Sequence, residues 1–193
     1  MEVTYKQTLE ALIEGCLRQE PLAQKRLYER YFGKLMGVCM RYASCKSEAM
    51  EILNNAFLKI FTSIEQYKRG NGNFEGWMYR IVVNSAIDHL RKEIKHRHTD
   101  EEKAIFIETS EDILSALQAE EIIALVNKLS PAYRAVFNLY IVEGYTHQEI
   151  ATQLNITEGT SKSNLAKARM NLQKMLRETM KIQDTKLLAN GTE

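Results

Sequence analysis

Helix-breaking residues are scarce in this sequence, which has two prolines and nine glycines among its 193 residues. Long helices can therefore run without interruption, because proline and glycine are the residues that most disfavour a helix interior. Strictly alternating runs of aromatic and β-branched residues, which would indicate half-buried strands, do not occur. The remaining composition, 45% hydrophobic and 26% charged, is that of an ordinary globular protein. We therefore predict an all-α fold.

Cysteines are also few and unpaired in pattern. Cys16, Cys39 and Cys45 form neither a CxxC pair nor an even set for disulfides, and we expect buried thiols in a reducing compartment. No apolar stretch approaches the roughly 20 residues that span a bilayer, and the first residues carry charges where a signal peptide has an apolar core. We expect a cytoplasmic protein that does not insert into a membrane.

Charge is unevenly distributed, although the formal net charge is only +1. Residues 99–121 contain eight acids and one lysine, whereas residues 158–181 contain six bases and two acids. A second basic cluster lies at residues 91–98. Two basic segments separated by an acidic one suggest two DNA-facing surfaces. Solvated helix faces would explain any one of these segments equally well, so charge alone does not indicate nucleic acid.

Helical spacing of apolar residues organises the beginning of the chain. A short helix is expected over residues 8–19, and a longer one from Pro21, since proline suits the first turn of a helix. Ser47 is the expected N-cap of the next helix, because a serine side chain can accept from the free amides of a first turn.

A loop and a further helix complete the first half. Residues 67–73 (YKRGNGN) supply glycines and asparagines for a loop, and Asn73 is placed to cap the helix that follows. Periodicity fades after Lys95. We therefore predict a first domain over residues 1–95 and a charged linker over residues 96–109.

The second half has clearer helix boundaries. Ser130 caps and Pro131 opens a helix that ends near Val142, before Glu143 and Gly144. We predict a second small helical domain over residues 110–182 and a flexible tail over residues 183–193.

Two further helices follow in this half. Thr146 and Glu149 have the spacing of a capping box at the start of a short helix that ends near Leu154. Thr157 then caps a last helix that extends to about Met180.

These two helices, the first about two turns long, are joined by a turn of three or four residues and predict a helix-turn-helix in the second domain. Ala151 is small where the helices must approach, and Asn155 tolerates the left-handed conformation that the turn requires. The second helix is basic and polar, as suits phosphates and base edges. A generic pair of helices is the alternative, and Ser161 occupies a position where an apolar residue is usual. The candidate DNA-binding residues of this helix are Thr160, Lys162, Ser163, Asn164, Lys167 and Arg169.

The sequence resembles the extracytoplasmic-function sigma factors of bacterial RNA polymerase. The segment LSPAYRAVFNLYIVEGYTHQEIATQLNITEGTSKSNLAKARMNLQKML is similar to their C-terminal domain. The segments SEAMEILNNAFLKIF and FEGWMYRIVVNSAIDHLRK are similar to their N-terminal domain. Together these segments account for most of the chain from about Ala23 to Leu176. The resemblance implies a factor that binds core polymerase and directs promoter-specific initiation, with the helix-turn-helix reading the −35 element.

The resemblance also implies roles for the N-terminal half. The helix SEAMEILNNAFLKIF would dock on the β′ coiled coil of polymerase, with contact candidates Glu48, Glu51, Asn54, Asn55 and Lys59. The loop and the helix after it would melt the −10 element and hold an unstacked base. The candidates for this −10 contact are Lys68, Arg69, Asn71, Asn73, Arg80, Asn84 and Arg91.

Further partners follow from the family alone. The resemblance implies contact with the β flap of polymerase, and in many members an anti-sigma protein holds the factor inactive. It implies no catalysis by the factor itself. No nucleotide-binding loop, catalytic triad or histidine pattern with metal-ligand spacing contradicts this, so we expect no catalytic residue, no metal and no cofactor.

Two other functional classes remain open. A helix-turn-helix regulator that does not replace sigma would have the same C-terminal domain, but its N-terminal half would carry a ligand or phosphoacceptor site. A helical adaptor without a DNA role would show no salt-sensitive affinity for DNA, whereas phosphate contacts make binding fall steeply with salt. An enzyme is a more distant alternative.

Overall fold

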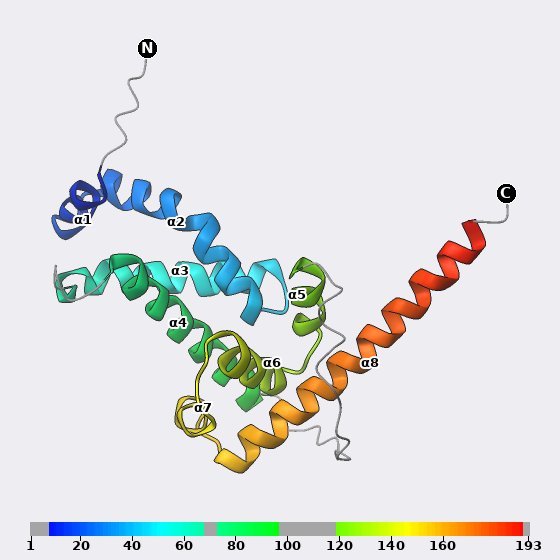
Figure 1. Cartoon of the computed structure of the whole chain (residues 1–193). Helices are drawn as coiled ribbons and strands as arrows, with labels where there is room; N and C mark the ends of the chain where they lie inside the picture. The colour runs from blue at the N-terminus through cyan, green and yellow to red at the C-terminus, as the bar shows by residue number, and fades with distance from the viewer. Residues whose placement is uncertain (1–7, 68–72, 97–118, 191–193) are drawn as a thin grey trace. The chain divides into compact units, whose positions relative to one another are not determined.

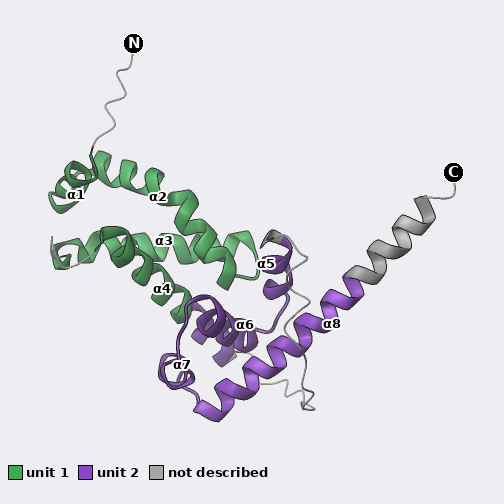
Figure 2. Cartoon of the chain, in the orientation of Figure 1, with its two compact units in different colours: residues 1–88 green, residues 89–193 purple. Residues whose placement is uncertain are grey.

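The computed structural model describes residues 8–67, 73–96 and 119–190, and all the regular structure in these ranges is helical (Figure 1). The predicted all-α class is therefore confirmed. Contacts divide the chain into one unit over residues 1–88 and another over residues 89–193 (Figure 2). The domain bounds expected from the sequence stay a prediction. Most of the expected linker lies outside the described residues.

The first unit is built on three helices and the beginning of a fourth. These are α1 (Leu9–Leu17), α2 (Pro21–Tyr42), α3 (Lys46–Ser63), a short 3₁₀ turn at Ile64–Gln66, and α4 (Phe74–His96), whose residues after Asp88 belong to the second unit. Their apolar faces meet in one core, because each helix repeats its hydrophobic residues every three or four positions. Fully buried members of this core include Leu27, Leu35, Tyr42, Leu53, Ile60 and Met78.

Two of the predicted helix starts in this unit are confirmed. Pro21 is the first residue of α2. Asn73 precedes α4, and its side-chain Oδ1 accepts a hydrogen bond of 2.9 Å from the Glu75 amide, which is the N-capping interaction expected of an asparagine at this position.

The start predicted for α3 is wrong by two residues. Cys45, in extended conformation, is the N-cap, and Ser47 lies within the first turn. The cause is a competing local interaction: the Glu48 carboxylate accepts from the Ser44 amide at 2.7 Å and from its hydroxyl at 2.6 Å. A carboxylate that reaches back to the chain before the helix extends the turn toward the N-terminus.

The second unit contains α5 (Ala119–Asn127), α6 (Pro131–Phe137), a π-helical turn η3 (Asn138–Val142), α7 (His147–Leu154) and α8 (Glu158–Asn190). The predicted starts at Pro131, His147 and Glu158 are confirmed, as is the end of α7 at Leu154. The core of this unit includes Val136, Leu139, Ile150, Ala168 and Leu176.

The helix expected from Pro131 to Val142 changes character at Asn138. The Glu143 amide donates to the Asn138 carbonyl at 3.0 Å, a bond across five residues that defines a π turn. The chain then turns at Gly144, whose φ of +74° lies in the left-handed region that favours glycine. Tyr140, Ile141 and Val142 are exposed in succession.

Helix α8 is longer than its sequence pattern suggested. It continues to Asn190, ten residues past the expected end near Met180. The segment after Met180 contains no glycine or proline before Gly191, so nothing in it terminates a helix. Residues 183–190, predicted to be a flexible tail, are therefore helical.

The cysteine prediction is correct for two residues and wrong for the third. Cys16 and Cys39 are buried free thiols, whereas Cys45 is exposed because it lies in the turn between α2 and α3. None of the helices described has the length and apolar character needed to cross a membrane.

Candidate functional site

The turn between α7 and α8 has the geometry of a helix-turn-helix. Thr146 and Glu149 form the predicted capping box: the Thr146 amide donates to the Glu149 carboxylate at 2.8 Å, and the Glu149 amide to the Thr146 hydroxyl at 3.3 Å. Asn155 adopts the predicted left-handed conformation, with φ 54° and ψ 49°. The Ile156 amide bonds the Ala151 carbonyl at 3.0 Å. These local bonds fix the direction in which α8 leaves the turn.

The first turns of α8 present the polar side chains expected to meet DNA. The Thr160 amide bonds the Thr157 hydroxyl at 3.0 Å, so Thr157 is the predicted cap. Thr160 and Lys162 are exposed, and Ser163 and Asn164 are partly exposed. The structure thus brings these four candidates together on the N-terminal part of the recognition helix.

The charged candidates of α8 differ in their surroundings. Lys162 forms an ion pair with Glu158 at 2.7 Å, and the hydrogen bond from Lys162 lowers the pKa of the Glu158 carboxyl. The Lys167 ammonium lies 5.9 Å from the centre of the Tyr133 ring, in cation–π range. Arg169 is exposed. All three are on α8, but only Lys162 lies within its first turn and a half.

Ser161 is explained by a contact that the sequence reading missed. Its side chain is fully buried, with 0% of the residue exposed, and its hydroxyl lies 2.9 Å from Nδ1 of His147. His147 is the first residue of α7, so the pair joins the first turns of both helices. A polar residue can replace the usual apolar one because its hydrogen bond is satisfied.

The predicted −10 residues are only partly within the described ranges. Lys68, Arg69 and Asn71 lie outside them. Asn73 uses its side chain to cap α4. Arg80 and Asn84 are both exposed one turn apart on α4, where they share a face.

Arg91, the last of the −10 candidates, has partners on α7. Its guanidinium donates to the backbone carbonyl of Gln153 and, at 3.3 Å, to the side-chain oxygen of the same residue. Binding of DNA by Arg91 would therefore require these bonds to be exchanged.

An aromatic cluster joins Tyr67, which precedes in sequence the part of the loop outside the described residues, to Phe74 and Trp77 of α4. The Tyr67 ring is 5.0 Å from Phe74 and 5.7 Å from Trp77, and the last two rings are 5.6 Å apart. Phe74 is buried, whereas Tyr67 and Trp77 are half-buried. The three rings pack on one another at the start of α4.

The α3 face carries a shallow groove with a volume of about 610 Å³. Three predicted polymerase contacts line it, Glu51, Asn54 and Asn55, together with residues that the sequence reading assigned no such role: Lys46, Ser47 and Met50. Their spacing of three and four along one helix was the available signal. The Tyr28 hydroxyl donates to Oδ1 of Asn54 at 3.1 Å and so orients this amide.

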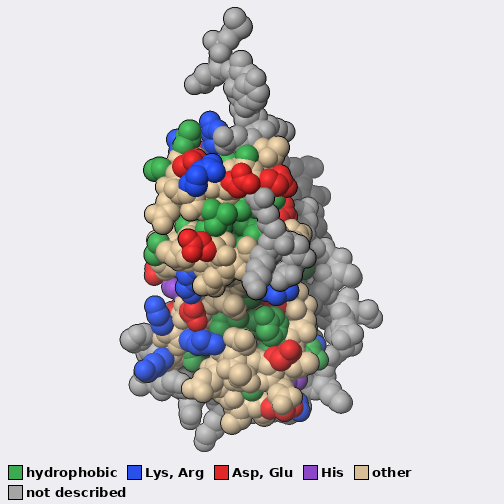
Figure 3. All heavy atoms as spheres, turned by 90° about the vertical axis from the view of Figure 1, so that its left-hand side faces the viewer, with side chains coloured by type: hydrophobic (Ala, Val, Ile, Leu, Met, Phe, Trp, Pro, Cys, Tyr) green, Lys and Arg blue, Asp and Glu red, His purple; other side chains and the backbone are tan. Residues whose placement is uncertain are grey.

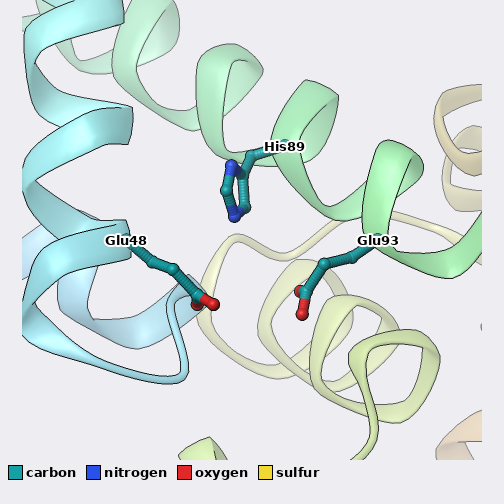
Figure 4. A group of neighbouring side chains, drawn as sticks. All are labelled: Glu48, His89 and Glu93. Atoms are coloured by element: carbon teal, nitrogen blue, oxygen red, sulfur yellow. The ribbon is translucent and has the colours of Figure 1, made fainter. Parts of the chain in front are cut away.

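The other two polymerase candidates are engaged within the protein. Lys59 pairs with Asp88 at 2.9 Å, and Glu48 accepts the bonds from Ser44 described above. Glu48 lies in the first turn of α3, while His89 and Glu93 lie one turn apart on α4 (Figure 4). The Glu93 carboxylate accepts from the buried guanidinium of Arg134 at 3.1 Å, so it is part of a structural ion pair.

Acidic, basic and apolar side chains are interspersed on the face that Figure 3 presents. No single sign of charge dominates that view.

Comparisons with known proteins identify both halves of the chain. Residues 27–95 match the family model described as Sigma-70 region 2, and residues 119–172 match the one described as Sigma-70, region 4. The two matched segments together span more than half of the sequence.

Individual relatives match along most of their length. The RNA polymerase sigma-H factor of Pseudomonas aeruginosa is 27% identical over 183 residues, which cover 88% of this chain and 94% of that protein. The ECF RNA polymerase sigma factor SigW of Bacillus subtilis is 28% identical over 191 residues, 92% of this chain and all of that protein. A chain in the co-crystal structure of the sigma factor RpoE with the anti-sigma factor NepR from Bartonella quintana is 20% identical. Its TM-score is 0.47, and the match covers 79% of this chain and 96% of that one.

Proposed function

We propose, from the premise that this chain belongs to the sigma-70 family of RNA polymerase sigma factors, that its two matched regions divide promoter recognition between them. As a sigma factor, the protein directs promoter-specific initiation. In the proposed division, α8 reads the −35 element, and α4 with the preceding loop melts the −10 element. The observation that supports this most is the recognition helix α8, whose exposed Thr160 and Lys162 follow the cap at Thr157.

Core polymerase is the proposed partner of the α3 groove. Glu51, Asn54 and Asn55 offer one carboxylate and two amides to a facing helix, a set suited to hydrogen bonds and to a modest charge attraction. The proposed partners are the β′ coiled coil for this groove and the β flap for the second unit. Promoter DNA and, as in many family members, an anti-sigma protein complete the set.

We propose no catalytic role for this chain. Polymerase forms the phosphodiester bonds, and the factor contributes binding and the deformation of DNA. The place of action is accordingly the cytoplasm, where polymerase and chromosome meet.

Run-off transcription with core polymerase and promoter DNA from the same genome tests the assignment of α8. Lys162→Glu reverses a charge in residues 158–164, the recognition turns at the start of α8. It should abolish the factor-dependent transcript while leaving binding to core polymerase intact. Lys174→Glu reverses an exposed charge more than three turns further along α8 and should retain most activity. Equal losses in the two variants would contradict the assignment of the recognition turns.

Core binding separates a sigma factor from a regulator that does not replace sigma. Glu51→Lys, in the groove, should weaken binding to core polymerase, whereas Glu65→Lys, at an exposed acid outside the groove, should not. Failure of the wild-type protein to bind core polymerase would exclude the sigma function and favour the regulator.

A further inference from the structure

We propose that His147 and Ser161 form a positioning pair that seats the recognition helix and so determines which −35 bases this factor prefers. The inference rests on the proposed function, because it assigns a cause to the base preference of α8. Neither residue needs to touch DNA for this role.

Ser161 is a buried polar residue at the start of α8. It is the only residue of the first two turns of α8 that is fully buried among those described, and its neighbours Thr160 and Lys162 are exposed. A hydroxyl buried without a hydrogen-bond partner destabilises a fold. The 2.9 Å contact with His147 therefore stabilises Ser161 in its buried position. The Ser161 amide also bonds the Thr157 carbonyl at 3.0 Å, which ties the residue to the cap of the helix.

His147 is itself held from two sides. Its ring stacks on Tyr140 with centroids 4.5 Å apart and an interplanar angle of 21°. Its backbone begins α7 directly after Thr146, between the two residues of the capping box. The stacking therefore restrains the plane of the imidazole ring, and the helix start restrains the backbone that carries it. His147 of α7 thus contacts both Tyr140 of the π turn and Ser161 of α8.

The direction of the bond is what gives the pair its effect. An apolar contact at position 161 would resist separation of the helices but would tolerate rotation of α8, because hydrophobic contact is non-directional. A hydrogen bond weakens steeply as its angle departs from linearity. The His147–Ser161 bond therefore restrains rotation of α8 about its axis. Thr160, Lys162 and Ser163 lie on either side of this pivot, and their reach to base edges depends on that rotation.

Holoenzyme binding to a panel of promoters with single-base changes in the −35 element tests the pair. Ser161→Ala and His147→Ala should each change the ratio of affinities between −35 variants by about fivefold or more, the range of one base contact. The double variant should change it no further, because both substitutions remove the same bond. Thermal melting of each variant verifies that the fold is retained.

Two substitutions at position 147 add a geometric control. His147→Asn places a polar atom near the position of Nδ1 and should restore the wild-type ranking of promoters. His147→Gln places it near Nε2 instead and should not. Gln148→Ala, at the next and exposed residue of α7, should leave the ranking unchanged.

Three results are distinguishable. Altered rankings that are non-additive support the pair. A uniform loss of affinity with the ranking preserved, or no change in Ser161→Ala and His147→Ala, overturns it and leaves the proposed function intact. A wild-type holoenzyme without any −35 preference contradicts the proposed reading of the −35 element by α8 before the variants are compared.

Discussion

Lys162 and Glu158 lie one turn apart at the start of the recognition helix, with Nζ 2.7 Å from Oε1. Both side chains are more than half exposed. The pair places an acid beside a base that is expected to approach phosphate. The Glu158 carboxylate therefore holds Lys162 in the free protein, and DNA must displace it to bind this ammonium group.

Removing the charge of Glu158 should strengthen the binding of promoter DNA. Glu158→Gln should raise affinity for promoter DNA by about twofold to fivefold at low salt, the range expected of exposed ion pairs. The gain should shrink toward zero in about 1 M salt, where the screening length is only about 3 Å. Fluorescence anisotropy across a salt series measures both effects. Glu178→Gln, at an exposed acid near the other end of the described side chains, is the control and should show no gain.

The capping box of α7 predicts a dependence of stability on pH. Bonds from the Thr146 amide and then its hydroxyl lower the pKa of the Glu149 carboxyl. Because the folded pKa is below the unfolded one, this contribution is present above the unfolded value and is lost as pH falls through the folded value. Urea unfolding should show wild type more stable than Glu149→Gln at pH 7, with the difference vanishing in acid.

Thr146→Ala removes the other half of the same box. We expect a loss of about 1 kcal/mol in the free energy of unfolding, the usual effect of deleting an N-cap side chain. Thr152→Ala, at an exposed threonine later in α7, is the matched control. An equal loss in the two variants would mean that the cap contributes nothing particular to this helix.

A side chain at position 15 is expected to destabilise the packing of α1 on α2. A Cβ at this position would lie 2.5 Å from the Cβ of Ala23, which is buried where α1 approaches α2. Gly15→Ala should lower the free energy of unfolding by about 1 to 3 kcal/mol, as overpacking does. Gly33→Ala, in an exposed and open site of α2, should instead raise it by about 0.5 to 1 kcal/mol because alanine favours a helix.

The three cysteines should differ in reactivity. Burial raises the pKa of the Cys16 thiol to about 11 and that of Cys39 to about 12. Because the thiolate is the reactive form, a thiol reagent at pH 8 should modify Cys45 quickly and the other two only on unfolding. Cys45→Ser should abolish the fast phase. Rapid reaction of more than one thiol in the native protein would contradict the burial of Cys16 and Cys39.

Local hydrogen-bonding chemistry was readable from the sequence. The boundaries of α7 and the start of α8 depend on Thr146, Glu149, Asn155 and Thr157, and each of these acts on neighbours within four residues. Such interactions depend on residue type and spacing, which the sequence displays directly. The helix-turn-helix was therefore predictable almost residue by residue.

Contacts between elements were not readable in the same way. Ser161 could not be explained before His147 was known to face it, because the two are 14 residues apart and meet only through packing. The early start of α3 depended on which of several side chains would bond Glu48. The π turn at Asn138 adds a residue to a helix without any sequence signal. The glycines and asparagines of the loop before α4 indicated a loop but not the arrangement of its side chains.

Because α8 is long, a small change in the orientation of its first turn produces a large displacement at its far end. Its 33 residues span about 50 Å at 1.5 Å per residue. A tilt of about 5° at its first turn would displace the far end of a rigid helix of that length by about 4 Å. A change too small to detect at the DNA-reading turn is thus magnified at the opposite terminus. A fluorophore attached after Asn190 would act as a pointer, and its distance from a second dye near α7 would report how firmly the recognition turn is seated.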